Sequence, residues 1–290
     1  MRWRKLERST QVQDRRGRPS RGAAIGGGGV GIAAVLAIVL SMCGGGADLS
    51  QLAPMLEGLG APAAAPQDVG TVPTDPESVE EREFVEAVLG STETLWTDMF
   101  VGSGVAYEPA SLVLFSGSTS SACGGANSRV GPHYCPPDQT IYIDLDFFGE
   151  LQAKFGARGG DFAEAYVIAH EVAHHVQNVL GISDDVRQLQ QQHPDDANDL
   201  SVRIELQADC LAGVWANSIY QREGVLQPGD IEEGLDAAAA VGDDRIQETI
   251  QGRVNPESWT HGSSQQRVDW FTTGYESGDP NLCDTFSSDL

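Results

Sequence analysis

An uncharged run near the start of the chain separates a basic head from an acidic body. Residues 22–47 carry no charge, and the run is long enough for one membrane-spanning helix, which needs about 20 apolar residues. Residues 1–21 hold eight basic and two acidic side chains, whereas the rest of the 290-residue chain holds 10 basic and 40 acidic ones. Because Lys and Arg accumulate on the cytoplasmic flank of an anchor, we predict a cytoplasmic head at 1–21, a single transmembrane helix at 22–43 and an extracytoplasmic body.

A cleaved signal peptide is the alternative interpretation of this N-terminal pattern, because it also combines basic residues with an apolar run. No A-x-A cleavage site follows Leu40. A lipoprotein cleaved before Cys43 would need a small residue where Met42 stands. Both observations favour an uncleaved anchor over a secreted or lipidated form.

Composition and charge restrict the class of protein and its partners. Hydrophobic residues make up 40% and charged residues 21%, which excludes a wholly disordered chain and a multi-span membrane protein. The net charge of −24 disfavours nucleic acid as a partner. We therefore expect a folded body that contacts the membrane only through its anchor.

The body is expected to contain a linker followed by one domain. Residues 44–78 are rich in Ala, Pro and Gly, a composition that cannot bury a core. In residues 79–290, few strands among long helices indicate a helix-rich α+β domain with a small sheet. The patterns predict a helix from Ser78, with Ser78 and Glu81 in a capping box, and a helix over 161–181, with Asp161 and Glu164 in a second capping box. Further helices are predicted over 200–220 and after Asp230, and strands are predicted over 112–115 and 140–145.

The cysteines fit an exported domain. Cys43 belongs to the predicted membrane segment, and the four others allow three pairings. Cys123 and Cys135 flank a loop rich in Gly, Ser, Asn and Pro and form the natural local pair, which leaves Cys210 with Cys283. Their spacings do not fit a structural zinc site, and disulfides persist in oxidising compartments.

The segment His170-Glu171-Val172-Ala173-His174 carries the strongest chemical signal. Residues i and i+4 share one face of a helix, so His170 and His174 can reach the same metal ion. Glu171 lies next to the first histidine, where it can take a proton from a water activated by zinc. The sequence therefore predicts a zinc-dependent hydrolytic site.

A catalytic zinc site needs a third protein ligand. The pattern H-E-x-x-H-x-x-G-x-x-H is not met, because Gln177 and Leu180 replace its glycine and its last histidine. Glu205 on a later predicted helix is the alternative ligand, and Asp209 lies on the same helical face. A carboxylate such as that of Asp209 can accept the second ring N–H of a metal-binding histidine and fix its tautomer.

Several stretches within residues 79–286 resemble one known family, the bacterial neutral zinc metallopeptidases, in the broad group of zincins with a glutamate as third ligand. The resemblance implies a zincin-like fold, one catalytic Zn²⁺ ion, metalloendopeptidase activity and a peptide or protein substrate. The matching stretches are CGGANSRVGPHYCPPDQTIYIDLDFF at 123–148, HEVAHHVQ at 170–177, ELQADCLAGVWA at 205–216, GDIEEGLDAAAAVGDDRIQ at 229–247, THGSSQQRVDWF at 260–271 and the tail GDPNLCDTF.

Two further histidines have competing interpretations. His261 precedes Gly262-Ser263-Ser264 and is a candidate hydrogen-bond donor to the transition-state oxyanion, and a loop or helix-cap role is the alternative. His175 points about 100° away from His174 around the helix, so we expect it to pack or to face solvent.

Together these patterns predict a membrane-anchored zinc metallopeptidase. His170, His174 and Glu205 would bind zinc, Glu171 would act as general base and Asp209 would orient a histidine. The alternative from another class is a non-catalytic envelope protein that zinc only stabilises and that binds a partner. Glu171 argues against this alternative, because a closed structural zinc site needs no neighbouring base. An enzyme that trims a single envelope partner would share every motif.

Overall fold

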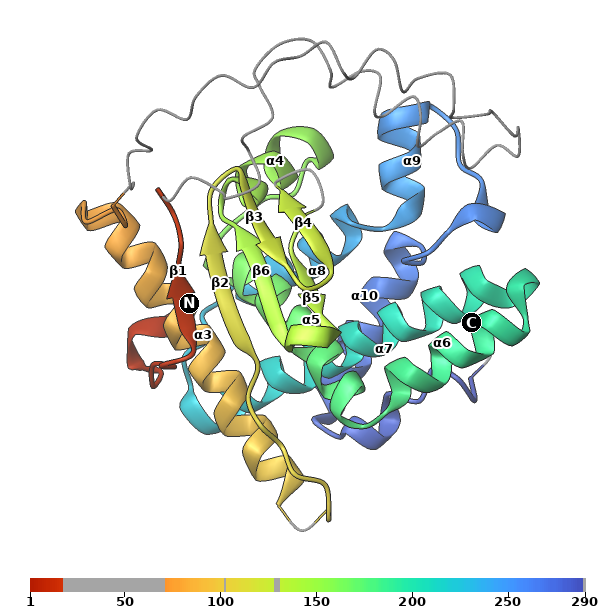
Figure 1. The fold of residues 1–290 in the computed structure, drawn as a ribbon, viewed down its shortest axis with the longest axis horizontal. Helices are drawn as coiled ribbons and strands as arrows, with labels where there is room; N and C mark the ends of the chain where they lie inside the picture. Colours follow the sequence, from red (N-terminus) through yellow and green to blue (C-terminus); the bar gives the residue numbers. More distant parts are fainter. Residues whose placement is uncertain (18–70, 102, 128–130, 289–290) are drawn as a thin grey trace, which may run out of the picture. The chain divides into compact units, whose positions relative to one another are not determined.

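The computed structural model describes residues 1–17, 71–101, 103–127 and 131–288, and their fold is shown in Figure 1. The described residues on both sides of the long gap belong to one compact unit. The predicted transmembrane helix at 22–43 and most of the predicted linker at 44–78 lie outside the described residues. Within the described ranges, no helix is long and apolar enough to cross a membrane.

The described elements confirm a helix-rich α+β fold with a small sheet. The strands are β1 (Val12–Asp14), β2 (Ser111–Phe115), β3 (Ser118–Ser121), β4 (Gly124–Asn127), β5 (His133–Cys135) and β6 (Thr140–Asp144). The α-helices are α3 (Pro76–Phe100), α4 (Asp146–Phe155), α5 (Asp161–Val179), α6 (Ile182–Gln192), α7 (Ala197–Ser218), α8 (Asp230–Ala240), α9 (Asp243–Gln251) and α10 (Ser264–Ser277). Short 3₁₀ turns are η1 (Trp3–Lys5), η3 (Pro136–Asp138), η4 (Pro194–Asp196), η6 (Pro256–Ser258) and η7 (Pro280–Leu282), and a π-helical turn, η5 (Ile219–Glu223), follows α7.

Four strands form the main sheet in the order β1-β2-β6-β5. The first three strands run parallel, and β5 is antiparallel to β6 at the edge. Leu112 and Leu114 of β2 join the main core with the helices, whereas Val113 and Phe115 join a smaller apolar cluster on the other face. Because successive side chains of a strand alternate between faces, a sheet covered on both sides has strands that are apolar throughout.

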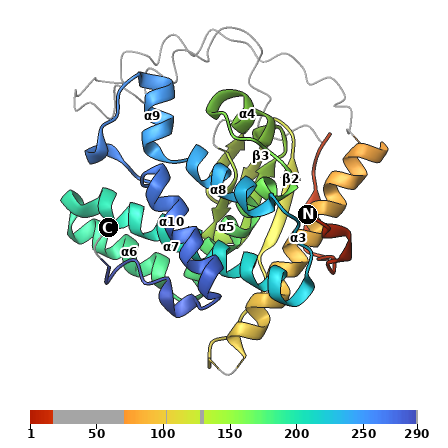
Figure 2. The ribbon, with the colours of Figure 1, turned by 180° about the vertical axis from the view of Figure 1, so that it is seen from behind.

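Helix α5 contacts α3, α7 and α8, and α7 packs against α10, as the two opposite views in Figures 1 and 2 show. Two glycines allow α7 and α10 to approach closely. A Cβ atom at Gly213 of α7 would lie 2.1 Å from the Phe271 carbonyl oxygen, and a Cβ at Gly274 of α10 would lie 1.8 Å from the Cys210 carbonyl oxygen. This close packing brings a side chain of α10 to the metal centre described below.

Residues 1–17 belong to the folded unit, whereas the sequence analysis set residues 1–21 apart as a head. Strand β1 pairs with β2, and Trp3 and Leu6 are buried in the main core at 5% and 7% exposure. Gly90 of α3 lets this segment pass close by, because a Cβ there would lie 2.3 Å from the Glu7 carbonyl oxygen. Apolar burial and strand pairing thus outweigh the positive charge that suggested a separate segment.

Both predicted disulfides are present in the structure. Cys123, in the turn between β3 and β4, pairs with Cys135 at the end of β5. Cys210 of α7 pairs with Cys283 near the C-terminus. The second bond attaches the C-terminal segment to the helix that carries Glu205.

Candidate metal centre

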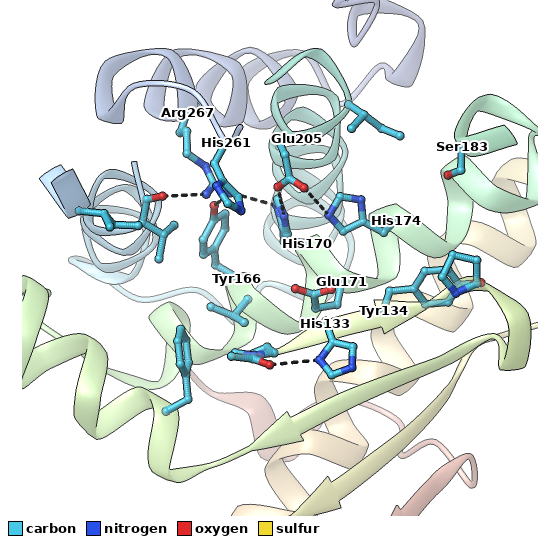
Figure 3. Close-up of a pocket in the computed structure, with 18 residues that line it drawn as sticks. His133, Tyr134, Tyr166, His170, Glu171, His174, Ser183, Glu205, His261 and Arg267 are labelled. Carbon is cyan, nitrogen blue, oxygen red and sulfur yellow. Dashed lines mark hydrogen bonds and ion pairs between the residues drawn. The ribbon is translucent and has the colours of Figure 1, made fainter. Parts of the chain in front are cut away.

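Helix α5 places two histidines and a glutamate of the HExxH segment together. Apolar residues such as Ile168 and Val172 bury this helix in the main core, so its position is determined by packing. His170 and His174 lie one turn apart with ring centroids separated by 4.8 Å. Their placement on one face confirms the spacing argument, and both rings point toward α7 (Figure 3).

Glu205 of α7 completes a three-residue group with these histidines. Its Oε2 lies 3.2 Å from His170 Nε2, and its Oε1 lies 3.4 Å from His174 Nε2. One ligand atom from each residue lies within 4.8 Å of the others, as in a site that holds a metal ion. The structure therefore brings together the three residues that the sequence analysis proposed as ligands.

The donor set and its spacing fit a zinc ion. Two ligand atoms bound to zinc at about 2.1 Å in tetrahedral geometry lie roughly 3.4 Å apart. The two distances from Glu205 to the histidine nitrogens are 3.2 and 3.4 Å. Two imidazoles and one carboxylate, with room for a fourth ligand on the cavity side, are also the donors of known catalytic zinc sites.

The Nδ1 atom of each of these two histidines, on the side of the ring away from Glu205, faces a hydrogen-bond acceptor. His170 Nδ1 lies 2.9 Å from Asp209 Oδ1, and His174 Nδ1 lies 2.8 Å from the side-chain oxygen of Gln177. Because a carboxylate or amide oxygen only accepts, each Nδ1 carries the proton, and in the neutral ring Nε2 presents its lone pair. Asp209 thus lies where the sequence analysis expected it, and the structure adds Gln177.

Strong electrostatic interactions hold this centre together. Burial raises the pKa of Asp209, but Arg267 and His170 lower it more, to about 2. Burial lowers the pKa of His170, but Asp209 and Glu205 raise it more, to about 10. Without a metal, His170 is therefore a cation between two carboxylates, and a metal ion that binds Nε2 must displace its proton.

A cavity of about 570 Å³ opens beside the three ligands and is drawn in Figure 3. Glu171 lies on the cavity side of α5, and its residue is only 7% exposed. The other walls are largely apolar and come from α4, α5, α7, α9, the end of α8, and β5 with the residues that flank it. They include Pro132, Tyr134, Pro136, Phe147, Val167, Ile204, Val241 and Ile246.

His261 also lines this cavity, and Asp243 holds it. Asp243 Oδ1 lies 3.2 Å from His261 Nδ1. Asp243 Oδ2 accepts backbone N–H groups from Thr260, His261 and Gly262 at 2.6 to 3.1 Å. The segment that carries His261 is therefore held by the carboxylate of Asp243, the first residue of α9.

The sequence profile described as "putative neutral zinc metallopeptidase" matches residues 1–286. The chain belongs to this family. It is 46% identical over 297 residues to the uncharacterized protein YpfJ of Escherichia coli K12, with both chains covered completely. It is also 50% identical over 213 residues to the uncharacterized protein Rv2575 of Mycobacterium tuberculosis H37Rv, and the match covers 70% of each chain. No solved structure matches it.

As a member of this family, the chain is a zinc metallopeptidase by family. Its candidate zinc site is the group formed by His170, His174 and Glu205. The profile begins at residue 1, so the segment that carries β1 belongs to the family sequence as well. This agrees with the burial of Trp3 and Leu6 in the domain.

Sequence analysis missed several residues of this metallopeptidase site. Arg267 lies within the quoted stretch 260–271, but an isolated arginine on a helix has no distinctive spacing. Gln177 follows His174 by three residues, a helical neighbour spacing that would have revealed it. His175 is buried, which agrees with the first of its two expected roles, packing or facing solvent. Its ring forms hydrogen bonds with Tyr134 Oη at 2.9 Å and with the Glu108 carbonyl oxygen at 2.7 Å, and these bonds fix one wall of the cavity.

Proposed function

We propose that this protein hydrolyses peptide bonds, with zinc held by His170, His174 and Glu205 and with Glu171 as general base. One observation carries the proposal: the three ligand atoms converge at zinc-like distances on a cavity that Glu171 also lines. A closed structural zinc site would have neither the cavity nor the neighbouring carboxylate.

A zinc ion at this site would supply Lewis-acid activation of the attacking water and of the scissile carbonyl group. The chain's own residues supply the proton transfers. Glu171 takes one proton from the water as its oxygen bonds to the carbonyl carbon, and then gives that proton to the amine nitrogen as the C–N bond breaks. The second proton of the water also passes to the released amine, so one water and one peptide bond yield a carboxylate and an ammonium group.

His261 is proposed to stabilise the negative charge that develops on the carbonyl oxygen. With Nδ1–H directed at Asp243, the ring protonated at Nε2 can donate a hydrogen bond into the cavity. The geometry supports this role over the loop or helix-cap alternative, because His261 lines the same cavity as Glu171.

The cavity walls support an apolar substrate side chain beside the cleaved bond. Val167 lies one helical turn before His170, whereas Val241 at the end of α8 and Ile246 of α9 face the same space. The charged groups that line this cavity are Glu171, Glu205 and Arg267, together with histidines. Glu171, Glu205, His170, His174 and His261 have roles in the proposed site, and most of the other lining residues are apolar, so we expect peptides with an apolar residue next to the scissile bond to be preferred.

We also propose that the catalytic unit works outside the cytoplasm and is attached to the membrane through the segment at 22–43. The two disulfides support an oxidising compartment. Because residues 1–17 belong to the same compact unit as the site, this proposal places them in the compartment of the site. A single transmembrane span at 22–43 would put residues 1–17 and the site on opposite sides, so this proposal replaces the predicted span with a segment that contacts the membrane from one side.

The full chain loaded with Zn²⁺ and incubated with a diverse peptide pool tests the proposed function. New termini are read by mass spectrometry, with Glu171→Gln as the matched variant. We expect the variant to bind one zinc ion per chain and to lose cleavage by at least about 100-fold, because the base is removed while the ligands stay. Equal cleavage by both proteins would refute the role of Glu171.

Two further outcomes separate the alternatives. If wild type binds zinc but cleaves no peptide, the non-catalytic, zinc-stabilised binding protein or an enzyme restricted to one partner replaces the proposal. Unchanged zinc content in Glu205→Ala would remove Glu205 from the ligand set.

A further inference from the structure

Arg267 of α10 is buried next to the metal centre although it is not a candidate ligand. Its residue is 3% exposed. The guanidinium donates to Asp209 Oδ2 through Nε at 2.7 Å and to Asp209 Oδ1 through Nη2 at 3.0 Å. Nη2 also donates to Tyr166 Oη at 3.2 Å, and Nη1 donates to the Val241 carbonyl oxygen at 3.2 Å.

Asp209 is the residue on which these contacts converge. Its Oδ1 accepts from His170 Nδ1, from Tyr166 Oη and from Arg267, whereas its Oδ2 accepts from Arg267. A planar guanidinium that binds both oxygens of a carboxylate sets the plane and the rotation of that carboxylate. The direction of the hydrogen bond to His170 therefore depends on Arg267.

We propose that Arg267 is a positioning residue that acts through Asp209 to hold the His170 ring in the orientation that presents Nε2 to zinc. The inference rests on the proposed function, since it assumes that His170 binds the metal. Arg267 Nη2 lies only 3.4 Å from His170 Nδ1, but the two nitrogens share Asp209 Oδ1 as their acceptor. The arginine thus positions the acceptor of His170.

The packing of α10 explains how this arginine reaches the site. Gly213 and Gly274 bring α7 and α10 together, so Arg267 on α10 faces Asp209 on α7. Tyr166, one turn before His170 on α5, donates to the same carboxylate. Three helices therefore meet at Asp209, and the orientation of His170 depends on all three.

A purely structural role is the competing explanation, because a buried carboxylate needs a cationic partner to be stable. The chain offers a matched control for that role. Arg16 is 4% exposed and binds Asp14 through Nε and Nη2 at 2.8 to 3.2 Å, in the N-terminal segment. Arg16→Gln should therefore destabilise the fold through a similar loss without touching the metal centre.

The experiment compares the full-length wild type, Arg267→Gln, Arg267→Lys and Arg16→Gln. Zn²⁺ affinity is measured by competition with a chromophoric chelator, and unfolding is measured on the same samples. We expect Arg267→Gln to bind Zn²⁺ about 10- to 100-fold more weakly, as is typical when the hydrogen-bond partner of a metal ligand is perturbed. We expect Arg16→Gln to stay within about twofold of wild type.

A spectroscopic readout distinguishes positioning from destabilisation. The visible spectrum of the Co²⁺-substituted protein reports the ligand geometry, and we expect it to change in Arg267→Gln and to stay unchanged in Arg16→Gln. Arg267→Lys keeps the charge without the bidentate fork, so its affinity should lie between those of wild type and Arg267→Gln. Arg267→Lys also serves as the test if Arg267→Gln does not fold.

Wild-type affinity and an unchanged Co²⁺ spectrum in Arg267→Gln, or equal losses in Arg267→Gln and Arg16→Gln, would overturn this inference and leave the proposed function intact. Wild-type protein that binds no Zn²⁺ would overturn both.

Discussion

His261 illustrates at the residue scale how one side chain depends on a distant carboxylate. Asp243 bonds its ring nitrogen and three backbone N–H groups of the segment 260–262. Burial raises the pKa of Asp243, but hydrogen bonds from His261 and Thr260 lower it more, so Asp243 is ionised at neutral pH. The same carboxylate thus accepts from the ring of His261 and from the backbone of the segment that carries it.

We predict that His261→Ala lowers kcat by about 100-fold and leaves zinc content unchanged, because one donor to the oxyanion is lost. Asp243→Asn should lower kcat by a smaller factor, roughly 10-fold, since the ring remains but loses its charged partner. The measurement is steady-state cleavage of a peptide identified in the pool, with exposed His193→Ala as the matched control. A kcat for His261→Ala equal to that of His193→Ala would remove His261 from the mechanism.

Glu164 near the start of α5 makes stability depend on pH. Burial, with smaller effects of Asp161 and Glu81, raises the pKa of Glu164 from 4.5 to about 7. The folded protein therefore binds more protons than the unfolded chain between pH 4.5 and 7, so stability falls as pH rises through this window. Glu164 lines a surface hollow that is also lined by Arg4 and by the carboxylates Glu77 and Glu80.

We predict that Glu164→Gln is more stable than wild type at pH 8, by up to about 3 kcal/mol, and equally stable at pH 4.5. The neutral amide removes the free energy needed to ionise a buried carboxyl group. Urea unfolding of both proteins between pH 4.5 and 8 measures this difference. A difference that does not vary with pH would show that Glu164 does not titrate in this range.

At the scale of elements, a local contact altered the start of one helix and a tertiary contact altered the start of another. The predicted capping box of Ser78 and Glu81 is not formed, because α3 begins at Pro76 and Asp75 accepts the Ser78 N–H. The N-cap of α5 is Gly160, which has no side chain to form the predicted box of Asp161 and Glu164. Instead, Glu233 of α8 accepts the Phe162 N–H at 3.3 Å.

The contact between α7 and α10 gives a prediction for element packing. Gly274→Ala should destabilise the fold by several kcal/mol, because its Cβ would lie 1.8 Å from the Cys210 carbonyl oxygen and the helices would have to separate. Gly149→Ala in α4 is the matched control, since nothing lies within 4 Å of its Cβ position. We expect this control to be neutral or stabilising by up to about 1 kcal/mol.

Thermal and urea unfolding measure both glycine variants. If Gly274→Ala were as stable as Gly149→Ala, the close approach of α7 and α10 would be wrong, and the argument that α10 positions Arg267 would lose its support.

At the scale of the whole molecule, the fold of the N-terminal residues gives a test of the proposed placement relative to a membrane. Residues 1–17 contribute β1 to the sheet, and Arg16 binds Asp14 and Glu81 in a buried position. A segment folded in this way shares one compartment with the candidate metal centre.

We predict that cysteines placed at exposed Thr10 and exposed Asp195 react alike with a membrane-impermeant maleimide in intact cells. Both cysteine variants are made in a protein that carries Cys43→Ser, so that the four other native cysteines are all paired in disulfides. Labelling of both sites before permeabilisation is expected for an exported unit. Labelling at 195 alone would show that residues 1–17 lie across the membrane and leave the domain.

The sequence by itself predicted the residues that meet at the candidate metal centre, because the HExxH spacing and the later pair Glu205 and Asp209 follow from local helix geometry. It also determined both disulfide pairs and the α+β class, which depend on loop composition and on local periodicity. Its placement of residues 1–21, by contrast, used charge and took no account of strand pairing.

Only the tertiary structure decided which distant residues complete the site. Arg267 lies 58 residues from Asp209, and Asp243 lies 18 residues from His261, so neither contact leaves a periodic signal. The same holds for β1, which pairs with a strand about 100 residues further along the chain. Such contacts arise from the packing of whole helices and strands, and single-residue patterns do not encode which elements become neighbours.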